Sequence, residues 1–388
     1  MNMVKLGGIC DFFNGGAWSQ NEFTEDGYPV LKVSNCKSNG FEIDSVSYIP
    51  HEIAQKSENN KLIIGDVIIA TVGSHPNLIE SAAGRSCVVT EEVAGFYLNQ
   101  NAVCLRSNDQ YILDQRYLGY LAASEPFKHY IQSRGKGAAN QMRIAIGAIK
   151  EFAFNLPDIV TQRKIGSFLA AYDDLIENNQ KQIKLLEEAA QRLYKEWFVD
   201  LRFPGHETTP VMEGIPEGWM QLSLEQVAPI LTGKKDANFS TEDGQYPFFT
   251  CAQTPLQAPS YSFACDAVIL AGNGDFNVKL YRGQFEAYQR TYVLSPENKE
   301  FLFLLYHAVN NSMAKLAQGA SGSTIKFLTK GMIASIPVYV PDELTLNKFN
   351  ELSEAIQKQI ETLKNAVACA TEARDRLLPK LMSGEIEV

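Results

Sequence analysis

The sequence lacks several features that would place it in a common class of protein. No stretch of 18 apolar residues occurs among its 388 residues, so we expect no membrane-spanning helix. The first residues, Met-Asn-Met-Val-Lys, show no signal-peptide pattern, and the seven cysteines are scattered without a Cys-x-x-Cys pair. These absences predict a cytoplasmic protein with reduced thiols.

Catalytic and cofactor-binding motifs are also missing. The sequence contains no Gly-x-x-x-x-Gly-Lys-Ser/Thr loop, no complete dinucleotide-binding loop, no His-Glu-x-x-His and no Gly-x-Ser-x-Gly. It also lacks the Asn/Asp-Pro-Pro-Tyr/Phe run that amino-methyltransferases use around their target base. The five histidines are spread along the chain, which favours structural or solvated roles. We therefore expect a binding protein rather than an enzyme, with no metal site.

An excess of positive charge is absent as well. The chain has 35 Lys and Arg against 45 Asp and Glu, a formal net charge of −10, which argues mildly against a nucleic-acid partner. The distribution of charge weakens that objection. Residues 126–150 carry five Lys or Arg and no acid, and residues 301–341 carry three Lys and no acid. A basic face on each half of the chain is therefore compatible with the overall negative charge.

Two segments repeat the same pattern of residues at alternating steps of three and four. This spacing is typical of the seam of a long helix that packs against another helix. The first seam comprises Ile165, Leu169, Tyr172, Ile176, Asn179, Ile183, Leu186, Ala190, Leu193 and Trp197. The second, 184 positions later, comprises Phe349, Ser353, Ile356, Ile360, Leu363, Val367, Ala370, Arg374, Leu377 and Leu381. We interpret the seam residues as structural, with Asn179 either fixing the register or facing solvent.

The same offset of 184 reaches well upstream of the helices. It relates Tyr117–Leu121 to Phe301–Leu305, Gly135 to Gly319 and Pro157 to Pro341, so about 80 residues align without a gap. A repeat of this length indicates an internal duplication of a globular unit followed by a helix. The length of the chain fits two such units of roughly 190 residues.

The boundaries of the domains follow from the repeat and from a segment rich in proline and glycine. We predict a first globular domain at 1–157, a long helix at 158–203, a linker at 204–218, a second globular domain at 219–341 and a second long helix with a tail at 342–388. Asp158 or Thr161 is expected to cap the first helix, and Asp342 or Thr345 the second. About 38 residues of helix make a rod roughly 55–60 Å long.

Within each globular domain, three elements recur. A buried strand is expected over 62–70, followed by Thr71-Val-Gly73, and its counterpart is 264–271, followed by Gly272-Asn-Gly274. A helix is expected over 114–132 and over 300–316. Glycine-rich turns follow at 134–141 and 318–324. Upstream of these elements the two copies align only with other offsets, 218 and then 200. The domains therefore differ while the helices match, which suggests different targets.

Taken together, these features resemble the specificity subunit of type I restriction–modification systems. The resemblance covers essentially the whole chain. It is carried by the duplicated layout and by the motifs Gly65–Gly73, Leu156-Pro157 with Gln162–Ile165, Leu193–Phe198 with Arg202–His206, and Leu377–Glu385. The second copy departs from the pattern, because Val340–Asn347 contains no glutamine corresponding to Gln162.

The resemblance implies a fold and a set of partners. In that family two target-recognition domains each read one half of a bipartite site in double-stranded DNA. We therefore expect an α+β chain in which 1–157 and 219–341 are these domains of mixed α/β structure. The two long helices would pair as an antiparallel coiled coil with pseudo-two-fold symmetry and set the spacer.

The expected partners carry the chemistry. Two methyltransferase subunits would dock on this scaffold and methylate adenine at N6 using S-adenosylmethionine. Restriction subunits would then join for translocation and cleavage driven by ATP and Mg²⁺. The resemblance implies that this chain itself is not catalytic and holds no cofactor.

Candidate DNA contacts lie mainly in the two glycine-rich turns. Asn, Gln and Arg suit the edges of adenine and guanine, whereas Ser, Thr and Lys suit hydroxyl or phosphate contacts. From the turns we select Arg134, Lys136, Asn140, Gln141, Arg143, Ser323, Thr324 and Lys326. Weaker candidates elsewhere are Ser74, His75, Lys234, Lys235, Tyr288 and Arg290. The alternative is that both turns are ordinary surface loops and that Tyr288 belongs to a hydrophobic core.

Two other functions remain open from the sequence. The chain is alternatively a coiled-coil scaffold for a protein complex with no DNA partner, or an enzyme that acts on a small ligand. The second alternative requires convergent ionisable side chains, and no motif indicates such a cluster.

Overall fold

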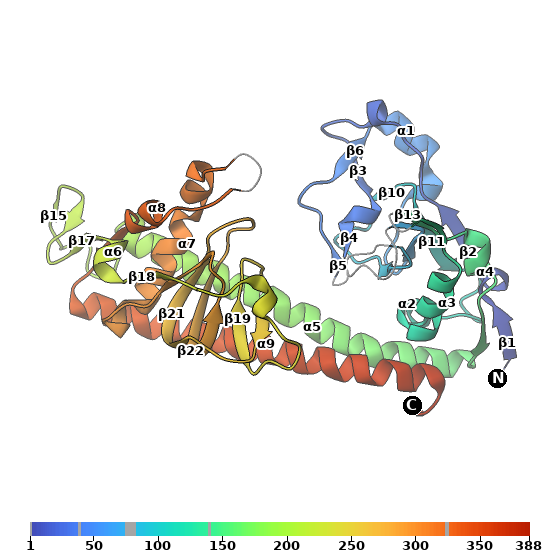
Figure 1. The fold of residues 1–388 in the computed structure, drawn as a ribbon. Coiled ribbons are helices and arrows are strands. Elements are labelled where there is room, and N and C mark those ends of the chain that lie inside the picture. The colour runs from blue at the N-terminus through green and yellow to red at the C-terminus, as the bar shows by residue number, and fades with distance from the viewer. Residues whose placement is uncertain (1, 38–39, 74–82, 139–140, 323–325) are drawn as a thin grey trace. The chain divides into compact units, whose positions relative to one another are not determined.

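The computed structural model describes residues 2–388 except 38–39, 74–82, 139–140 and 323–325 (Figure 1). It divides into two compact units. Unit 1 comprises Met1–Asn178 with Ala366–Val388, and unit 2 comprises Asn179–Asn365. Both are mixed helix and strand, and each takes part of both long helices. None of the described helices is long and apolar enough to cross a membrane.

The main sheet of unit 1 has four antiparallel strands. Its order is β2 (Cys10–Asn14), β11 (Ala102–Ser107), β7 (Val67–Ala70) and β9 (Ser86–Val88). All four residues of β7 are buried. The strand expected over 62–70 is therefore shorter than predicted, because Gly65 has a φ of 86° and turns the chain just before it.

Smaller sheets surround this core in unit 1. They are β10 (Tyr97–Leu98) with β3 (Tyr28–Leu31) and β6 (Ser47–Ile49), β12 (Lys136–Ala138) with β13 (Gln141–Arg143) and β8 (Val72–Gly73), and β4 (Cys36–Lys37) with β5 (Gly40–Phe41). The short helices of unit 1, whose globular part we call the first lobe, are α1 (His51–Lys56), α2 (Gln115–Ala123), α3 (Glu125–Ser133) and α4 (Ile146–Lys150). The single helix predicted over 114–132 is wrong. Ser124 has an extended backbone, and Pro126 fits only the first turn of a new helix.

The main sheet of unit 2 has six strands. Its order is β18 (Ile230–Thr232), β23 (Thr291–Leu294), β21 (Phe263–Ala271), β22 (Val278–Ala287), β19 (Tyr246–Phe249) and β20 (Leu256–Ala258), with only the β19–β22 pair parallel. The strand predicted at 264–271 is confirmed. The helices are α6 (Leu224–Val227), α7 (Leu302–Gly319) and α8 (Lys330–Ala334), and β15 (Val211–Met212) pairs with β16 (Ile215–Pro216).

In each unit, the strand at which the globular part begins pairs with the strand that precedes the long helix. In unit 1, β1 (Asn2–Lys5) is antiparallel to β14 (Ala153–Leu156). In unit 2, β17 (Met220–Ser223) is antiparallel to β24 (Pro337–Val340). The paired ends correspond between the copies, because Asn2 opposes Leu156 as Met220 opposes Val340. The chain therefore enters and leaves each lobe at one place, where the long helix begins.

The two long helices are α5 (Ile159–Tyr194), which continues as a π-helical turn over Lys195–Val199, and α9 (Glu343–Ser383). Aspartates cap both. Asp158 Oδ1 accepts from the amide of Thr161, and Asp342 Oδ1 from the amide of Thr345, each at 3.0 Å. Each cap satisfies an otherwise unpaired amide of the first helical turn. The same cap at equivalent positions shows that the duplication includes the helix starts.

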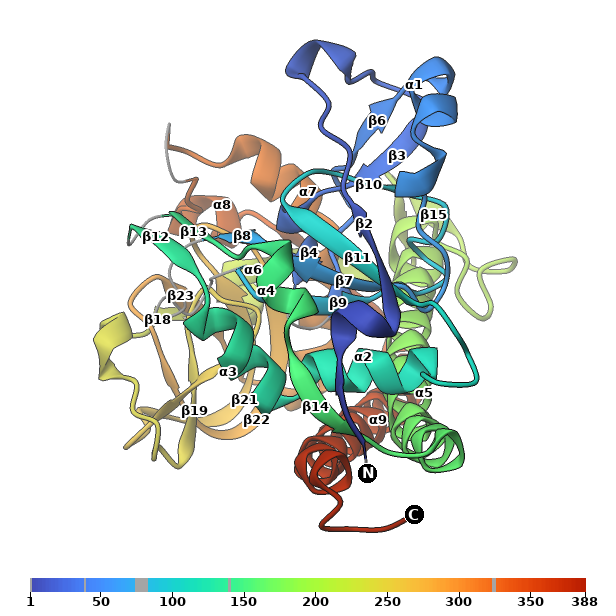
Figure 2. The same cartoon turned by 90° about the vertical axis from the view of Figure 1, so that its right-hand side faces the viewer.

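Seam residues of both helices are buried or half-buried. In unit 1, Ile165 and Leu169 of α5 share the hydrophobic core with Leu381 of α9. Figures 1 and 2 show the two helices side by side there. In unit 2, Tyr194 contacts Phe349 of α9 with ring centroids 6.3 Å apart. Each lobe is thereby packed onto both helices.

Candidate nucleic-acid interface

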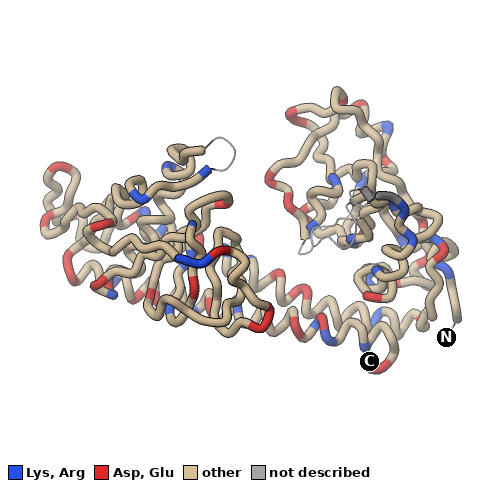
Figure 3. The backbone as a smooth tube through the Cα atoms, in the orientation of Figure 1, with Lys and Arg blue, Asp and Glu red and all other residues tan. Residues whose placement is uncertain are grey.

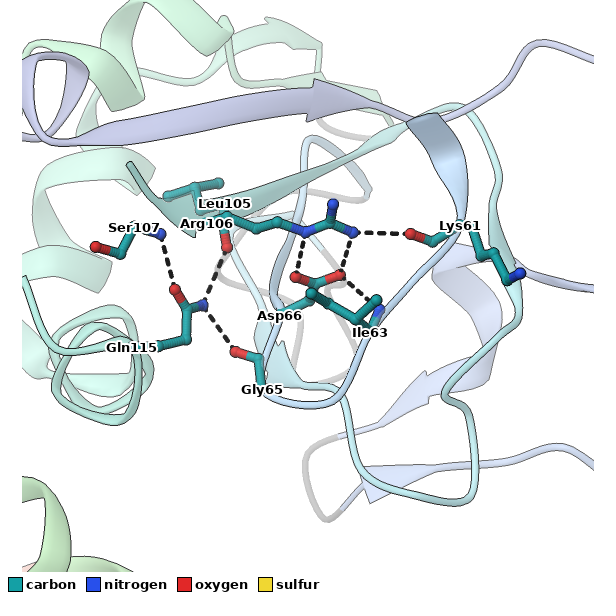
Figure 4. Close-up of polar contacts among 8 residues, drawn as sticks. All are labelled: Lys61, Ile63, Gly65, Asp66, Leu105, Arg106, Ser107 and Gln115. Atoms are coloured by element: carbon teal, nitrogen blue, oxygen red, sulfur yellow. Dashed lines mark hydrogen bonds and ion pairs between the residues drawn. The ribbon is translucent and has the colours of Figure 1, made fainter. Parts of the chain in front are cut away.

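A buried ion pair fixes the strand that leads to the candidate site in unit 1 (Figure 4). The Asp66 carboxylate accepts from Arg106 Nε at 2.6 Å and Nη2 at 2.7 Å, and from the Ile63 amide at 2.9 Å. Arg106 Nη2 also donates to the Lys61 carbonyl at 2.8 Å, and its hydrogen bonds to Asp66 raise the pKa of the guanidinium. This bidentate geometry holds the turn before β7 in a single conformation.

Gln115 ties the same turn to helix α2. Its side-chain Nε2 donates to the Gly65 carbonyl at 2.8 Å, and its Oε1 accepts from the Ser107 amide at 2.8 Å (Figure 4). A neutral amide is well suited to this position, because it satisfies both a donor and an acceptor of the backbone. The turn, β7 and α2 therefore form one rigid support.

Beyond β7, the chain meets the glycine-rich segment. Strand β8 pairs with β13, so that Gly73 opposes Met142 and Val72 opposes Arg143, and β13 pairs with β12. The Ile144 amide donates to the Thr71 carbonyl at 2.8 Å. The two motifs that the sequence placed 60 to 70 residues apart are thus neighbours in unit 1.

Unit 2 brings the corresponding segments together. The Leu328 amide donates to the Gly272 carbonyl at 2.8 Å, and the Gly274 amide donates to the Lys326 carbonyl at 3.1 Å. A Cβ at position 272 would lie only 2.4 Å from the Arg290 carbonyl oxygen, so this close approach requires glycine. In both units, therefore, the turn after the buried strand is bonded to the segment that contains the glycine-rich turn.

Further candidates join this arrangement in unit 2. Lys235 forms a β-bridge with Tyr288, and the Gly272 amide donates to the Arg290 carbonyl at 2.9 Å. These backbone bonds place three segments next to one another. A cavity of about 260 Å³ lies beside the bond between Gly272 and Arg290 and is lined by Gly272, Gln289, Arg290, Tyr292, Phe327 and Leu328.

The cations of these segments have no acidic partner in the part of the chain that the structure describes. The exposed residues of this kind are Arg134, Lys136, Arg143, Lys234, Arg290 and Lys326. Arg134 lies over the Tyr130 ring at 5.1 Å, and half-buried Lys235 lies over the Phe239 ring at 4.3 Å. Along the long helices, by contrast, basic and acidic residues are interspersed (Figure 3). An unpaired cation keeps its hydrogen-bond donors for an anionic partner.

Several candidates lie outside the described residues, namely Ser74, His75, Asn140, Ser323 and Thr324. Of Gln141, only the backbone of β13 is described. The sequence reasoning missed Gln289 and Phe327, which flank selected residues and line the cavity at Arg290. A phenylalanine beside a glycine-rich turn, 37% exposed here, was the signal available. Within the described ranges, no group of three or more His, Cys, Asp or Glu is placed to hold a metal ion.

Comparisons with known proteins agree on one family. A family model described as the type I restriction modification DNA specificity domain matches residues 1–188 and 216–366. The specificity subunit of the Escherichia coli type I restriction enzyme EcoDI is 37% identical over 178 residues, which are 44% of this chain but only 39% of that relative. The putative type I restriction enzyme MjaX specificity subunit of Methanocaldococcus jannaschii is 22% identical over 99% of this chain and 93% of that relative.

A solved structure has the same fold. The crystal structure of the type I restriction–modification system S subunit from M. genitalium matches with a TM-score of 0.61 at 16% identity. The match covers 98% of this chain and 95% of that subunit. The fold is therefore shared across a wide distance in sequence.

Proposed function

This chain belongs to the type I restriction–modification DNA specificity family, and we propose that its two lobes each read one half of a bipartite site in double-stranded DNA. Residues 1–157 and 219–341 are the recognition domains, and 204–218 is the linker between the first helix and the second domain. The chain has no catalytic role of its own. It directs methyltransferase and restriction subunits to their site.

The observation that carries this proposal is a feature found in both units, which we call the junction: the place where the turn after the buried strand meets the segment with the glycine-rich turn. In each unit the turn after a buried strand is bonded to the segment that holds the glycine-rich turn, and exposed cations with no acidic partner among the described residues lie around it. The backbone arrangement is repeated, whereas the side chains differ, because at the offset of 184 Arg143 corresponds to Phe327 and Met142 to Lys326. A repeated framework with different side chains is what two readers of different half-sites require.

The long helices pair antiparallel as a coiled coil with pseudo-two-fold symmetry and set the spacer between half-sites. Two contacts support this part of the proposal. Arg374 Nη1 lies 2.7 Å from Asp173 Oδ1 in unit 1, and Lys364 Nζ lies 3.2 Å from Glu187 Oε1 in unit 2. The residue numbers on α5 rise from 173 to 187 while those of their partners on α9 fall from 374 to 364, as expected for antiparallel helices. The apolar seam is then continuous along both helices.

Two methyltransferase subunits dock on this scaffold, one for each copy of the repeat. Exposed apolar side chains occur at equivalent positions of the two helices. Val160 is 60% exposed and its counterpart Leu344 is 65% exposed, and Phe168 and Leu352 form a second exposed pair. Because these side chains add little to the fold of either unit, their repetition favours two copies of one partner. S-adenosylmethionine belongs to that partner, and ATP with Mg²⁺ belongs to the restriction subunits.

The test is a gel-shift titration of the chain together with its methyltransferase on DNA that carries the methylated motif of its host genome. We expect specific binding that weakens as salt is raised, because phosphate contacts release counterions. A scrambled duplex of equal length is the control. Equal affinity for both duplexes, or no binding at low salt, would favour the protein scaffold without a DNA partner.

A further inference from the structure

Unit 2 contains a second cavity, separate from the candidate DNA junction. Its volume is about 530 Å³, and it lies where strands β19 and β22, helix α7 and both long helices meet. This size falls within the range typical of sites for small molecules. Nothing in the proposed DNA reading requires a hollow at this place.

The duplication explains how the cavity arises. In unit 1, Leu169 is fully buried in the core, and Arg374 is held in an ion pair with Asp173. At the equivalent positions of unit 2, 184 residues away, the chain has Ser353 and Ala190, and both line the cavity. Two large side chains are thus replaced by two small ones at one level of the helix pair. These smaller side chains leave more room at this level of unit 2.

Two residues that line this cavity carry a polar atom with no hydrogen-bond partner among the described residues. These atoms, Ser353 Oγ and His307 Nδ1, are shielded from solvent, and each residue is 4% exposed. Serine is also out of place on a helix seam, where an apolar residue packs better. Buried polar groups are nearly always satisfied in native proteins, so two unpaired atoms beside one cavity are unusual, although neither atom faces the open space.

The other residues of the wall indicate which class of ligand the cavity suits. The aromatic rings of Phe249, Tyr281 and Tyr306 line the cavity and suit a planar ring. Lys279 also lines it. The Lys279 ammonium donates to the Ala252 carbonyl at 2.9 Å and to Asn277 Oδ1. Burial lowers the pKa of this amine, although the negative charge of Asp275 acts in the opposite direction, so a bound anion would offset the cost of burying the ammonium.

The net charge of the residues that line the cavity is positive. Its one carboxylate, Glu187, is already paired with Lys364 at 3.2 Å. Burial also lowers the pKa of His307 to about 4, so the imidazole is neutral at physiological pH. The excess charge of the lining is therefore the ammonium of Lys279.

We propose that this cavity binds a small organic anion with a planar aromatic or heteroaromatic ring, held by Lys279. The rings of Phe249, Tyr281 and Tyr306 enclose the planar part, and the ammonium holds the anionic group. The site belongs to the second lobe, because the equivalent positions in unit 1 carry the larger side chains of Leu169 and Arg374.

Calorimetric titration of the full chain tests the proposal. The probes are adenosine 5′-monophosphate and naphthalene-2-sulfonate as planar anions, with adenosine and inorganic phosphate as the ring and the anion alone. We expect at least one planar anion to bind once per chain, at least tenfold more tightly than adenosine or phosphate. If neither planar anion binds at millimolar concentration, the proposal is wrong.

Two variants assign the binding to this cavity. Ser353→Leu restores the residue of unit 1, so it should fill the hollow, weaken the anion at least tenfold and keep or raise the melting temperature. Lys279→Met keeps the length of the side chain and should abolish the preference for the anion over adenosine. Lys348→Met, on the exposed side of α9, is the matched control and should bind as the parent does.

Unchanged binding by Ser353→Leu and Lys279→Met would place the ligand elsewhere and refute the assignment. DNA recognition is measured separately, as the sequence of the methylated motif in the host genome. We expect Ser353→Leu to leave that motif unchanged. A failure of the ligand site is therefore distinguishable from a failure of the proposed DNA function.

Discussion

Arg374 Nη1 donates to Asp173 Oδ1 at 2.7 Å, although the arginine occupies a position on the apolar seam of its helix. The hydroxyl of Tyr120 donates to the other oxygen of the same carboxylate at 2.5 Å. Together with burial, this hydrogen bond raises the pKa of the tyrosine above its usual range. The irregular residue of the seam therefore links both helices to α2 of the first lobe.

This relationship leads to a first prediction. A double-mutant cycle of Arg374→Ala and Asp173→Ala should give a coupling of about 0.5–1 kcal/mol in the free energy of unfolding, since both side chains are partly exposed and screened. Denaturant titration measures it. Arg376→Ala, which removes an exposed i,i+4 pair with Glu372, is the control and should change stability by less. Coupling within error of zero would contradict the prediction.

Stability should depend on pH through His307. Burial lowers the pKa of this imidazole from 6.5 to about 4, so the unfolded chain binds the proton more readily than the folded one. Its contribution is therefore fully present above pH 6.5 and is lost as the pH falls towards 4, by up to about 3 kcal/mol. Thermal unfolding between pH 4 and 8 measures the loss.

His307→Leu should flatten that part of the profile, whereas His129→Gln, on the exposed side of α3, should follow the parent chain. The comparison is between profiles, because carboxylates titrate in the same range. If the parent and the leucine variant lose stability in parallel, the buried imidazole is not the cause.

The cations of the second junction should separate into two kinds. We expect Lys234→Gln to lower the slope of log affinity against log salt by about one without changing the sequence read, as a phosphate contact does. Arg290→Gln should instead relax one base position, since a bidentate arginine is worth about 1–3 kcal/mol of discrimination. Lys348→Gln has the same charge change away from the junction, and should alter neither quantity.

The lobes should be independent readers. Because β17 and β24 close the second lobe where the chain enters and leaves it, residues 219–341 should be exchangeable for another such lobe. Methylome sequencing of the host should then show one half of the methylated motif changed and the other retained. A change in both halves would mean that the lobes do not read separately.

The helices should act as a ruler. Adding one heptad at the same level of both helices, near Ile183 and its antiparallel neighbour, keeps the seam in phase and lengthens the rod by about 10 Å. DNA rises about 3.4 Å per base pair, so the unread spacer should grow by about three base pairs. The half-sites should stay as they were. Full activity with an unchanged spacer, read from the methylome, would exclude the ruler.

Sequence reasoning worked best where a pattern is long and repeated. The period of the seams, the caps at Asp158 and Asp342 and the buried strand β21 all follow from local chemistry. It failed where one residue overrides a pattern, as Pro126 does by splitting α2 from α3. The glutamine missing from the second copy is explained only by packing. Gln162 bonds three backbone groups in unit 1, whereas its counterpart Leu346 joins the hydrophobic core of unit 2.

The candidate site was only half accessible to sequence reasoning. Its segments were identified because glycine-rich turns recur in both copies. Their meeting was not, since the pairing of Gly73 with Met142 depends on tertiary structure rather than on any local signal. Gln289 was missed for the same reason, whereas Phe327 lies beside a glycine-rich turn and could have been selected from the sequence. The cavity lined by Ser353 was visible only as an irregular seam position until the two units were compared.

The core of unit 1 has a consequence for the order of events during synthesis. Leu381 is 2% exposed among residues of the first lobe, and Ala366–Val388 belongs to that unit. The ribosome therefore makes the first lobe early but supplies one wall of its core only after the whole of unit 2 has been translated. Until then the hydrophobic core that contains Ile165 and Leu169 lacks Leu381 and stays partly exposed to solvent. The lobe that begins first is completed last, so a chaperone that shields apolar surface during translation has a defined place to act.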